Sequence, residues 1–149
     1  MSAFWLSDEQ EAIRDAVQKI CARFDDEYWR ETDATGVFPE AFVQAMAEGG
    51  WLGVAMPESV GGAGLGLTEA SIVMQAVAQS GAGFSGASAI HLNIFGPMPI
   101  VKFGTDEQKA KFLPRIIEGD DKMCFAVTEP NSGLDTSSLE TRAERTNEG

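Results

Sequence analysis

The stretch CFAVTEPNSGLDT, residues 124–136, combines residue types that could bind a cofactor. An apolar run that favours a strand ends in Thr128 and enters a turn that contains Gly133. Such a junction can direct backbone N–H groups and hydroxyls toward one point, which would suit a planar heterocycle with carbonyl oxygens followed by a phosphate. The same residues could also form a plain hairpin, and their types and spacing favour neither interpretation.

A second candidate for phosphate binding is the glycine-rich stretch SVGGAGLGL, residues 59–67. A Walker loop requires Gly-Lys-Ser/Thr, but no lysine follows Gly66. A Rossmann turn requires G-x-G-x-x-G between a strand and a helix, whereas the spacing here is GGxGxG and the preceding residues are poor strand formers. We therefore expect residues 61–66 to form a loop between two helices, with at least one glycine at positive φ.

Other residues that commonly carry chemistry lack the motifs for it. The single histidine, His91, has no Cys, Asp or Glu at a ligand-like spacing, which favours a packed, hydrogen-bonded structural residue and no metal site. Cys21 and Cys124 each stand among apolar neighbours, as buried free thiols do, and the sequence has no C-x-x-C. No G-x-S-x-G motif is present, and no carboxylate is singled out as a general base.

About six helices are expected before residue 122, and they would have to position these segments. Ser7 and Gln10 have the spacing of a capping box, and apolar residues at intervals of three and four follow them. Further helices are expected from about residue 39, over 68–79, over 87–95, at 101–104 and from Thr105 onward, where Gln108 repeats the capping-box spacing. The acidic residues 25–27 are expected in a solvated helix end or loop, and Pro114 is expected to kink or restart its helix.

The pattern changes at about residue 122. KMCFAVTE, residues 122–129, is a short strand-like run, and residues 137–146 alternate weakly as a second strand would. A strand pair in this position has little sheet to join. We therefore predict a mainly α fold, in which residues 1–121 form a helical domain and residues 122–149 form the start of a β-domain that is otherwise missing.

The composition limits the classes of partner. The formal net charge is −12 and the sequence pI is about 4.3, so neither nucleic acid nor an anionic membrane is expected to bind. The start, MSAFWLSDEQ, lacks the basic and apolar regions of a secretory signal. The sequence contains no run of about 18 uncharged apolar residues, which is the length that a helix needs to span a membrane. We expect a cytoplasmic location.

Three segments of the chain carry a joint resemblance to one enzyme family. PESVGGAGLG, residues 57–66, is similar to a proline-glutamate loop ending in GGxGLG. FGTDEQKAKFLPRIIEGD, residues 103–120, is similar to a GT-x-x-QK…LP helix with a GD exit. CFAVTEPNSGLDTSSLETRAE, residues 124–144, is similar to the flavin-binding stretch A-x-TEP-x-x-G-x-D with a following T-x-A. Together with the helix order, these segments resemble the N-terminal part of acyl-CoA dehydrogenases over nearly the whole chain.

The resemblance implies a fold and a reaction. The family has an N-terminal helical domain, a middle β-domain and a C-terminal four-helix domain, with FAD between the last two. A catalytic carboxylate removes the α-proton of a fatty acyl-CoA, the β-hydride passes to flavin N5, and the product is a trans-2-enoyl-CoA, as in β-oxidation. The resemblance further implies an electron-transfer flavoprotein as electron acceptor and a homo-oligomer, a dimer or tetramer. The catalytic glutamate comes from the C-terminal helical region, so no residue here is expected to be catalytic and the fragment alone is expected to be inactive.

Carried onto this sequence, the resemblance places flavin contacts on residues 125–128. Phe125 takes the aromatic position beside the flavin ring, and Ala126 belongs to the same cofactor-binding run. Backbone groups of Val127 and Thr128, together with the Thr128 hydroxyl, would meet the polar edge of the flavin.

The turn that follows is expected to meet the phosphates and the substrate. Gly133 and Leu134 would face the FAD pyrophosphate and the pantetheine of the substrate. Many members of the family have Ser where this chain has Leu134, so the backbone N–H is retained and the hydroxyl contact is either lost or replaced by Thr136. Leu134, Asp135 and Thr136 are thus the expected substrate-binding residues, although Asp135 is expected to order the turn rather than to touch substrate.

Two further interpretations remain open at this point. The chain could be a non-catalytic helical module that binds a partner chain, or it could belong to an acyl-CoA oxidase or flavin monooxygenase of the same fold. The dehydrogenase is favoured because the two long motif segments are of its type. Small residues at 86–89 could line part of an acyl pocket or could serve tight helix packing, and acyl chain length cannot be predicted from them.

Overall fold

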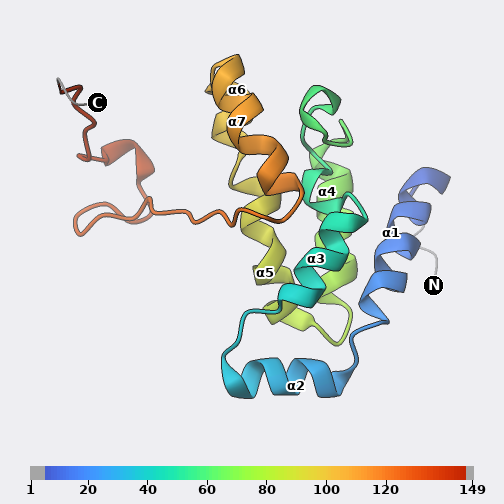
Figure 1. Ribbon diagram of the computed structural model, residues 1–149. Coiled ribbons are helices and arrows are strands. Elements are labelled where there is room, and N and C mark those ends of the chain that lie inside the picture. Colours follow the sequence, from blue (N-terminus) through green and yellow to red (C-terminus); the bar gives the residue numbers. More distant parts are fainter. Residues whose placement is uncertain (1–5, 147–149) are drawn as a thin grey trace.

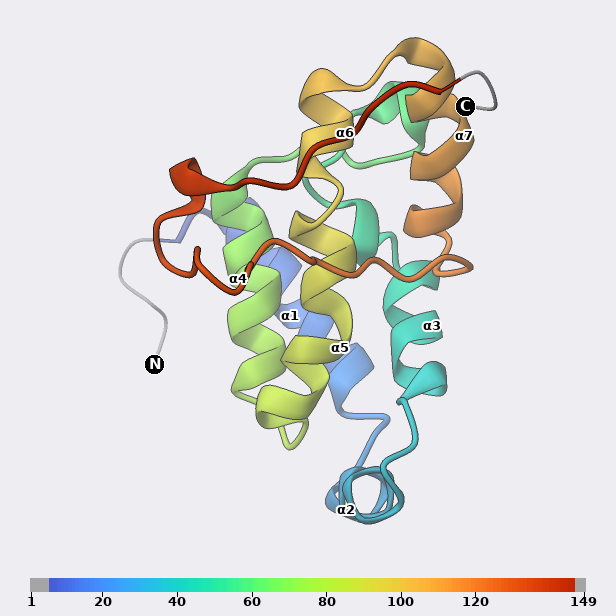
Figure 2. The ribbon, with the colours of Figure 1, turned by 90° about the vertical axis from the view of Figure 1, so that its left-hand side faces the viewer.

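The computed structural model describes residues 6–146, which form seven α-helices and three short 3₁₀-helices (Figures 1 and 2). They are α1 (Asp8–Cys21), α2 (Asp26–Thr35), α3 (Glu40–Glu48), η1 (Trp51–Gly53), η2 (Glu58–Val60), α4 (Leu67–Ala78), α5 (Gly83–Phe95), α6 (Met98–Phe103), α7 (Asp106–Ile117) and η3 (Thr136–Ser138). The predicted mainly α fold is confirmed. Residues 1–5, used in judging the secretory signal, and residues 147–149, the end of the predicted β-domain, lie outside the described part. None of the helices within residues 6–146 is long and apolar enough to cross a membrane.

Capping boxes begin α1 and α7, as the sequence predicts. The Ser7 hydroxyl accepts a hydrogen bond from the Gln10 N–H at 3.2 Å, and Gln10 Oε1 accepts one from the Ser7 N–H at 3.1 Å. Thr105 and Gln108 repeat this exchange at 3.2 and 2.9 Å. These bonds satisfy N–H groups that the first turn of a helix leaves unpaired.

The main core lies around α4, which packs against both α1 and α5. α3 and η1 add further apolar side chains to the same core. Its largest fully buried members are Val17, Phe42, Met46, Leu52, Val54, Val73, Val77, Ile90 and Ile94. Removal of these side chains from water is the dominant favourable contribution to folding.

α2 runs across one end of the other helices (Figures 1 and 2), and the sequence did not predict it. The Asp25 carboxylate caps its start by accepting from the Tyr28 N–H at 2.9 Å, and Gly36 follows its last turn at a φ of 65°. Residues 25–27 are exposed at this helix end, as expected from the sequence, but the helix that they begin was not predicted. Acidic residues stabilise a helix N-terminus because they complement its dipole and its unpaired N–H groups.

Trp29 docks α2 onto the core. Its ring centroid lies 5.0 Å from that of Phe42. A Cβ added to Gly86 would lie 3.2 Å from the Trp29 ring and 2.4 Å from the Ala82 Cβ, so Gly86 permits close packing of α5. Of the two roles considered for residues 86–89, this contact supports helix packing at Gly86.

The glycine-rich stretch joins η2 to α4, and two of its glycines have positive φ, Gly61 at 92° and Gly64 at 66°. The prediction of an interhelical loop with positive φ is confirmed. Gly62 is required for a different reason, because a Cβ there would lie 2.2 Å from the carbonyl oxygen of Met56. This loop therefore packs directly against the backbone of the preceding turn.

The N–H groups of this loop are all used within the chain. Those of residues 60–65 donate to backbone carbonyls of residues 53–58 at 2.8 to 3.2 Å. The Gly66 N–H donates to the Glu69 carboxylate at 3.0 Å. A glycine loop that binds phosphate must offer free N–H groups, so the geometry agrees with the rejection of a phosphate site here.

A second, smaller apolar cluster joins α7 to the region of η2. Met56, Leu113, Ile116 and Ile117 are its buried members. α7 continues through Pro114 to Ile117, so the helix does not restart at the proline. Burial of Leu113, Ile116 and Ile117 offsets the loss of the hydrogen bond that a proline removes from a helix.

No strand forms within residues 6–146, so the two strands predicted after residue 122 are wrong. The pairing found in this described part is one isolated antiparallel bridge between Glu129 and Ser132. Strands need further strands or a covering helix to be stable, and an isolated pair is marginal in water. Residues 122–146 instead form extended stretches, tight turns and η3.

Candidate functional site

The residues predicted to contact a flavin lie on one segment, residues 122–146, which is outside the helical core. Figure 1 shows this segment leaving the helices beside α5 and extending away from them. The Phe125 side chain is 63% exposed, and that of Leu134 is fully exposed. The other predicted residues are also exposed, except Val127, which is partly buried: Ala126, Thr128, Gly133, Asp135 and Thr136. The segment therefore gathers all of the predicted residues on one exposed stretch of chain.

Asn93 of α5 fixes the point where this segment leaves the helices. Its side chain is 3% exposed, and its Nδ2 donates to the carbonyls of Ile116 at 3.2 Å and Asp121 at 3.0 Å. Its Oδ1 accepts from the Met123 N–H at 3.0 Å. One buried amide thus joins α5 to the end of α7 and to the beginning of the candidate segment, with both amide protons used.

Asn93 was not predicted from the sequence, although a signal for it is present there. Asn93 lies between Ile90 and Ile94 on the apolar face of α5, and all three are buried. A polar residue on a buried helix face must find hydrogen-bond partners, because leaving it unpaired costs free energy. A buried polar residue at position 93 therefore indicates a structural anchor, and its partners are set by the fold.

Ion pairs hold the same junction from the solvent side. Arg115 donates from Nε and Nη2 to the two carboxylate oxygens of Asp121, both at 2.8 Å. These hydrogen bonds lower the pKa of Asp121. The ammonium group of Lys122 lies 2.7 Å from the Glu40 carboxylate of α3. The segment is therefore attached to α3, α5 and α7 before it becomes exposed.

Residues 124–128 form an extended stretch with an unpaired backbone edge. Within residues 6–146, the backbone N–H and C=O groups of these five residues make no hydrogen bonds. Exposed backbone groups of this kind can pair with another strand or with polar atoms of a ligand. The Phe125 ring and the Thr128 hydroxyl are exposed on the same stretch.

A tight turn follows at residues 129–135. The Glu129 N–H donates to the Ser132 carbonyl at 3.0 Å, and the Ser132 N–H donates back at 3.1 Å. The Ser132 hydroxyl donates to the Asp135 carbonyl at 2.6 Å. Gly133 has no positive φ, and a Cβ there would meet nothing within 4 Å. The contacts of the chain therefore give no reason for a glycine at this position.

The Asp135 carboxylate is used within its own turn. It accepts hydrogen bonds from the Ser137 N–H at 3.1 Å, from the Ser137 hydroxyl, and from the Ser138 hydroxyl at 2.6 Å. These bonds lower the pKa of Asp135, with the Ser137 hydroxyl as the largest cause. The arrangement agrees with the expectation that Asp135 orders the turn, and it places Thr136 at the start of η3.

Glu129 is a second residue whose structural role was not predicted from the sequence. Its carboxylate accepts from the Glu140 N–H at 2.8 Å, from the Thr141 N–H at 2.8 Å, and from the Thr141 hydroxyl. These hydrogen bonds, that from the Glu140 N–H first, lower the pKa of Glu129. The glutamate of the TEP motif thus connects residues 140–141 to the beginning of the turn.

Cys124 does not occupy the buried position predicted for it, and His91, predicted to be packed and hydrogen-bonded, lies exposed on α5 with its ring centroid 5.4 Å from that of Phe95. α5 turns Ile90 and Ile94 into the core, so His91 faces solvent. Cys124 is exposed because the chain has already left the core at that point. Cys21 is buried as expected, and burial raises the pKa of its thiol. No group of three His, Cys, Asp or Glu side chains in the described part of the chain could hold a metal ion.

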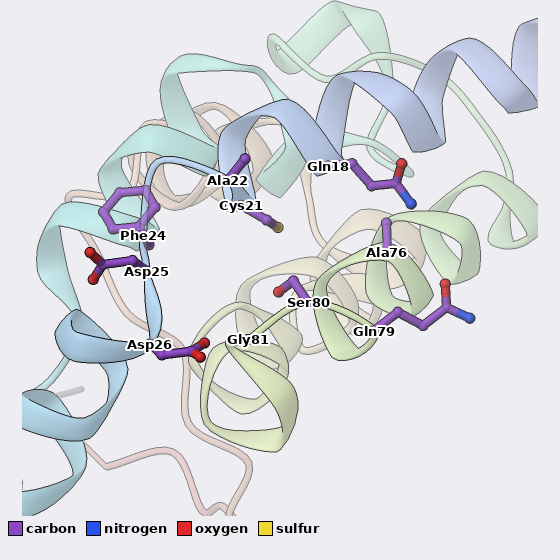
Figure 3. Close-up of a pocket in the computed structure, with 10 residues that line it drawn as sticks. All are labelled: Gln18, Cys21, Ala22, Phe24, Asp25, Asp26, Ala76, Gln79, Ser80 and Gly81. Carbon is purple, nitrogen blue, oxygen red and sulfur yellow. The ribbon is translucent and has the colours of Figure 1, made fainter.

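A surface cavity of about 270 Å³ lies where the ends of α1 and α4 meet the start of α2 (Figure 3). Its lining residues are Gln18, Cys21, Ala22, Phe24, Asp25, Asp26, Ala76, Gln79, Ser80 and Gly81. The lining has two carboxylates and no basic side chain, which is unfavourable for a phosphate-bearing ligand such as CoA or FAD. None of the residues predicted to contact a flavin lies in this cavity.

Comparison with known proteins identifies relatives of this chain. Residues 7–120 match the protein family described as the N-terminal domain of acyl-CoA dehydrogenases. Over 148 residues the chain is 35% identical to the acyl-CoA dehydrogenase FadE12 of Mycobacterium tuberculosis, covering 97% of this chain and 37% of that protein. Over 140 residues it is 35% identical to an acryloyl-CoA reductase (NADH) of Anaerotignum propionicum, and this match covers 94% of this chain and 35% of that protein. The chain thus spans well under half the length of these relatives.

A solved structure shares the helical arrangement. An acyl-CoA dehydrogenase from Bacillus anthracis, solved in complex with FAD, matches with a TM-score of 0.72 at 26% sequence identity. The match covers 93% of this chain and 24% of the solved chain. Sequence and fold comparisons therefore point to the same family.

Proposed function

The chain belongs to the acyl-CoA dehydrogenase family, and we propose that it supplies the N-terminal helical domain and part of the flavin site of an FAD-dependent enzyme that oxidises a fatty acyl-CoA to the trans-2-enoyl-CoA. The observation that carries this proposal is the extended stretch 124–128, which is held at both ends and exposes an aromatic ring beside an unpaired backbone edge. The proposal divides the chain as the sequence analysis did, into residues 1–121 and 122–149.

The side chains and backbone of residues 125–128 fit one edge of a flavin. The exposed Phe125 ring can pack against the planar ring system, with Ala126 beside it. The backbone groups of Val127 and Thr128 are available to hydrogen-bond the carbonyl oxygens and ring nitrogens of the flavin, as is the Thr128 hydroxyl. In this proposal these residues bind and orient the cofactor.

Gly133 and Leu134 would lie against the FAD pyrophosphate and the pantetheine of the substrate. The open space beside Gly133 supports a close approach by a ligand, since no contact within the chain requires a glycine there. Leu134 offers its N–H but no hydroxyl, and Thr136 is the nearby hydroxyl that could replace that contact. Asp135 belongs to the same proposed substrate side, with its carboxylate ordering the turn.

The chemical step would depend on groups beyond the residues described here. Bound FAD supplies the acceptor for the β-hydride, and the family's catalytic glutamate comes from a C-terminal helical region that no motif of this chain matches. A positioned base contributes on the order of 10²–10⁴-fold to such a reaction. The residues described here are therefore expected to bind and orient the cofactor and substrate rather than to catalyse by themselves.

One relative supports a second candidate function, in which the enzyme runs the reaction in the reverse direction and reduces the double bond. A protein that is 35% identical over 140 residues is described as an acryloyl-CoA reductase (NADH). A reductase of this kind adds hydrogen across the double bond that a dehydrogenase forms. An enzyme that reduces an enoyl-CoA is therefore the alternative to an acyl-CoA oxidising enzyme.

The partners of the complete enzyme form part of the proposal. An acyl-CoA is the substrate, an electron-transfer flavoprotein is the electron acceptor, and a homo-oligomer is the assembly, as the family resemblance implies. The cytoplasmic location expected from the sequence stays a prediction.

Flavin and substrate addition test the proposed function. The purified protein, produced with every residue that its gene encodes, is titrated with FAD while flavin fluorescence and visible absorbance are followed, and acyl-CoA thioesters are then added without oxygen. We expect a yellow complex whose visible flavin absorbance is bleached by an acyl-CoA. Bleaching by NADH, followed by recovery on addition of an enoyl-CoA, would instead identify the reductase.

A matched pair of variants connects the result to this segment. Phe125→Ala should weaken FAD binding, whereas Phe103→Ala, which removes another exposed aromatic ring on α6, should not. Absence of flavin binding by the complete protein would contradict the proposal and favour a helical module that binds a partner chain.

A further inference from the structure

The Glu129 carboxylate joins the two stretches that the sequence predicts as strands. One oxygen, Oε2, accepts from the Glu140 N–H at 2.8 Å, and the other, Oε1, accepts from the N–H and the hydroxyl of Thr141. These donors lie 11 and 12 residues further along the chain. One side chain therefore makes the connection that backbone hydrogen bonds make between paired strands.

The backbone of Glu129 closes the adjacent turn. It exchanges two hydrogen bonds with Ser132, whose side chain is 4% exposed and whose hydroxyl holds the Asp135 carbonyl. Glu129 is thus bonded both to the near side of the turn and to the chain that returns from it. Gly133 and Leu134 lie between these two sets of bonds.

We propose that Glu129 is a positioning residue that sets how the 124–128 edge and the Gly133–Leu134 turn are presented to FAD together. This inference rests on the proposed function. Glu129 is the first residue of the turn and follows Thr128 directly, so a change in its bonding would alter the angle between the two proposed contact regions. Glu129 itself has no need to touch the cofactor, since both of its carboxylate oxygens are already occupied.

The bonding pattern requires a carboxylate at this position. All of the groups that Glu129 faces are donors, two N–H groups and one hydroxyl. Glutamine has the same shape, but its amide nitrogen would place a donor against at least one of these donors. Aspartate keeps both acceptor oxygens on a side chain that is one methylene shorter, so it should restore part of the connection.

Amide exchange tests the connection in the absence of flavin. In Glu129→Gln, hydrogen exchange at the amides of Glu140 and Thr141 should become about tenfold faster, because a charge-assisted hydrogen bond is lost. Glu140→Gln is the matched control, since it removes the same charge from the same segment while leaving the Glu140 N–H in place. The thermal unfolding midpoint should be the same in both variants, because the segment is outside the helical core. Unchanged exchange in Glu129→Gln would overturn the inference.

Flavin binding tests the positioning role. In the FAD-bound protein, Glu129→Gln should raise the Kd for FAD about tenfold and change the visible absorption spectrum of the bound flavin, and Glu129→Asp should recover part of both effects. Glu140→Gln should leave both unchanged. Faster exchange with unchanged FAD affinity and spectrum would overturn the inference while leaving the proposed function intact. Absence of FAD binding in the unmodified protein would overturn the proposed function and this role with it.

Discussion

Gln10 Nε2 donates to Glu69 Oε1 at 2.9 Å and thereby joins the N-termini of α1 and α4. Gln10 also completes the capping box of α1 with its Oε1, while Glu69 accepts from the Gly66 N–H with its Oε2 at 3.0 Å. Each side chain thus caps its own helix and bonds to the other. Two helices whose bonded residues are 59 positions apart are coupled at their first turns.

This coupling predicts a pH-dependent stability. The hydrogen bond from Gln10 lowers the pKa of Glu69 below its ordinary value of 4.5. A carboxylate whose pKa is lowered by folding adds stability that is fully present above the unfolded pKa and is lost as the pH falls through the folded pKa. We expect Gln10→Leu to reduce the fall in the thermal unfolding midpoint below pH 4.5, measured by circular dichroism. Glu48→Gln, an exposed change on α3, should leave that fall as it is in the unmodified chain.

The buried amide of Asn93 predicts a loss of stability on its removal. Asn93→Leu would leave the Asp121 carbonyl and the Met123 N–H without their partner and would remove one of the two hydrogen bonds to the Ile116 carbonyl. This should lower the free energy of unfolding by about 1–3 kcal/mol in urea denaturation. His91→Ala, on the exposed side of the same helix, should change it by less than about 0.5 kcal/mol. Equal stability of the two variants would show that the Asn93 bonds contribute nothing.

The close approach of Gly62 to the backbone of Met56 predicts that any side chain at position 62 destabilises the fold. In Gly62→Ala the added Cβ would lie 2.2 Å from the Met56 carbonyl oxygen, so the backbone would have to move. We expect a loss of about 1–3 kcal/mol of unfolding free energy, as for other overpacked sites. Ala63→Ser, at the exposed neighbouring position, is the control and should unfold at nearly the same urea concentration.

Replacement of Gly133 is expected to weaken FAD binding without lowering the stability of the fold. Because nothing lies within 4 Å of a Cβ at this position and its φ is not positive, Gly133→Val should leave the unfolding midpoint unchanged. If a cofactor approaches this glycine closely, the same variant should weaken FAD binding about tenfold in a fluorescence titration. Unchanged FAD affinity would remove Gly133 from the proposed site.

The parts of the fold that could be predicted depend on local signals. The starts of α1 and α7 were predictable because a capping box consists of residues three positions apart. α2 was missed because its apolar side consists mainly of Trp29, so its position depends on contacts with the core rather than on a periodic stripe. The strands were wrongly predicted because a strand forms only with a partner, which residues 6–146 do not provide.

In the candidate site, too, only features with a local sequence signal could be predicted. The residue types drew attention to the 124–136 stretch, and the family resemblance assigned its contacts. The structure finds the assigned residues on one segment, exposed except for the partly buried Val127. Asn93 and Glu129, which hold that segment, were not chosen because their partners lie 23 to 30 and 11 to 12 residues away. Hydrogen bonds over such separations follow from the fold and are not encoded in a local pattern.

The bond between Asn93 and Met123 also determines where the helical part can be cut for engineering. A fragment that ends at residue 121, the boundary predicted from the sequence, would leave Asn93 Oδ1 buried without its donor. A fragment that ends after Met123 keeps this bond and the ion pair between Lys122 and Glu40. Chimaeras that exchange the proposed flavin-binding segment between relatives should therefore be joined after Met123, so that the grafted chain starts from a fixed point.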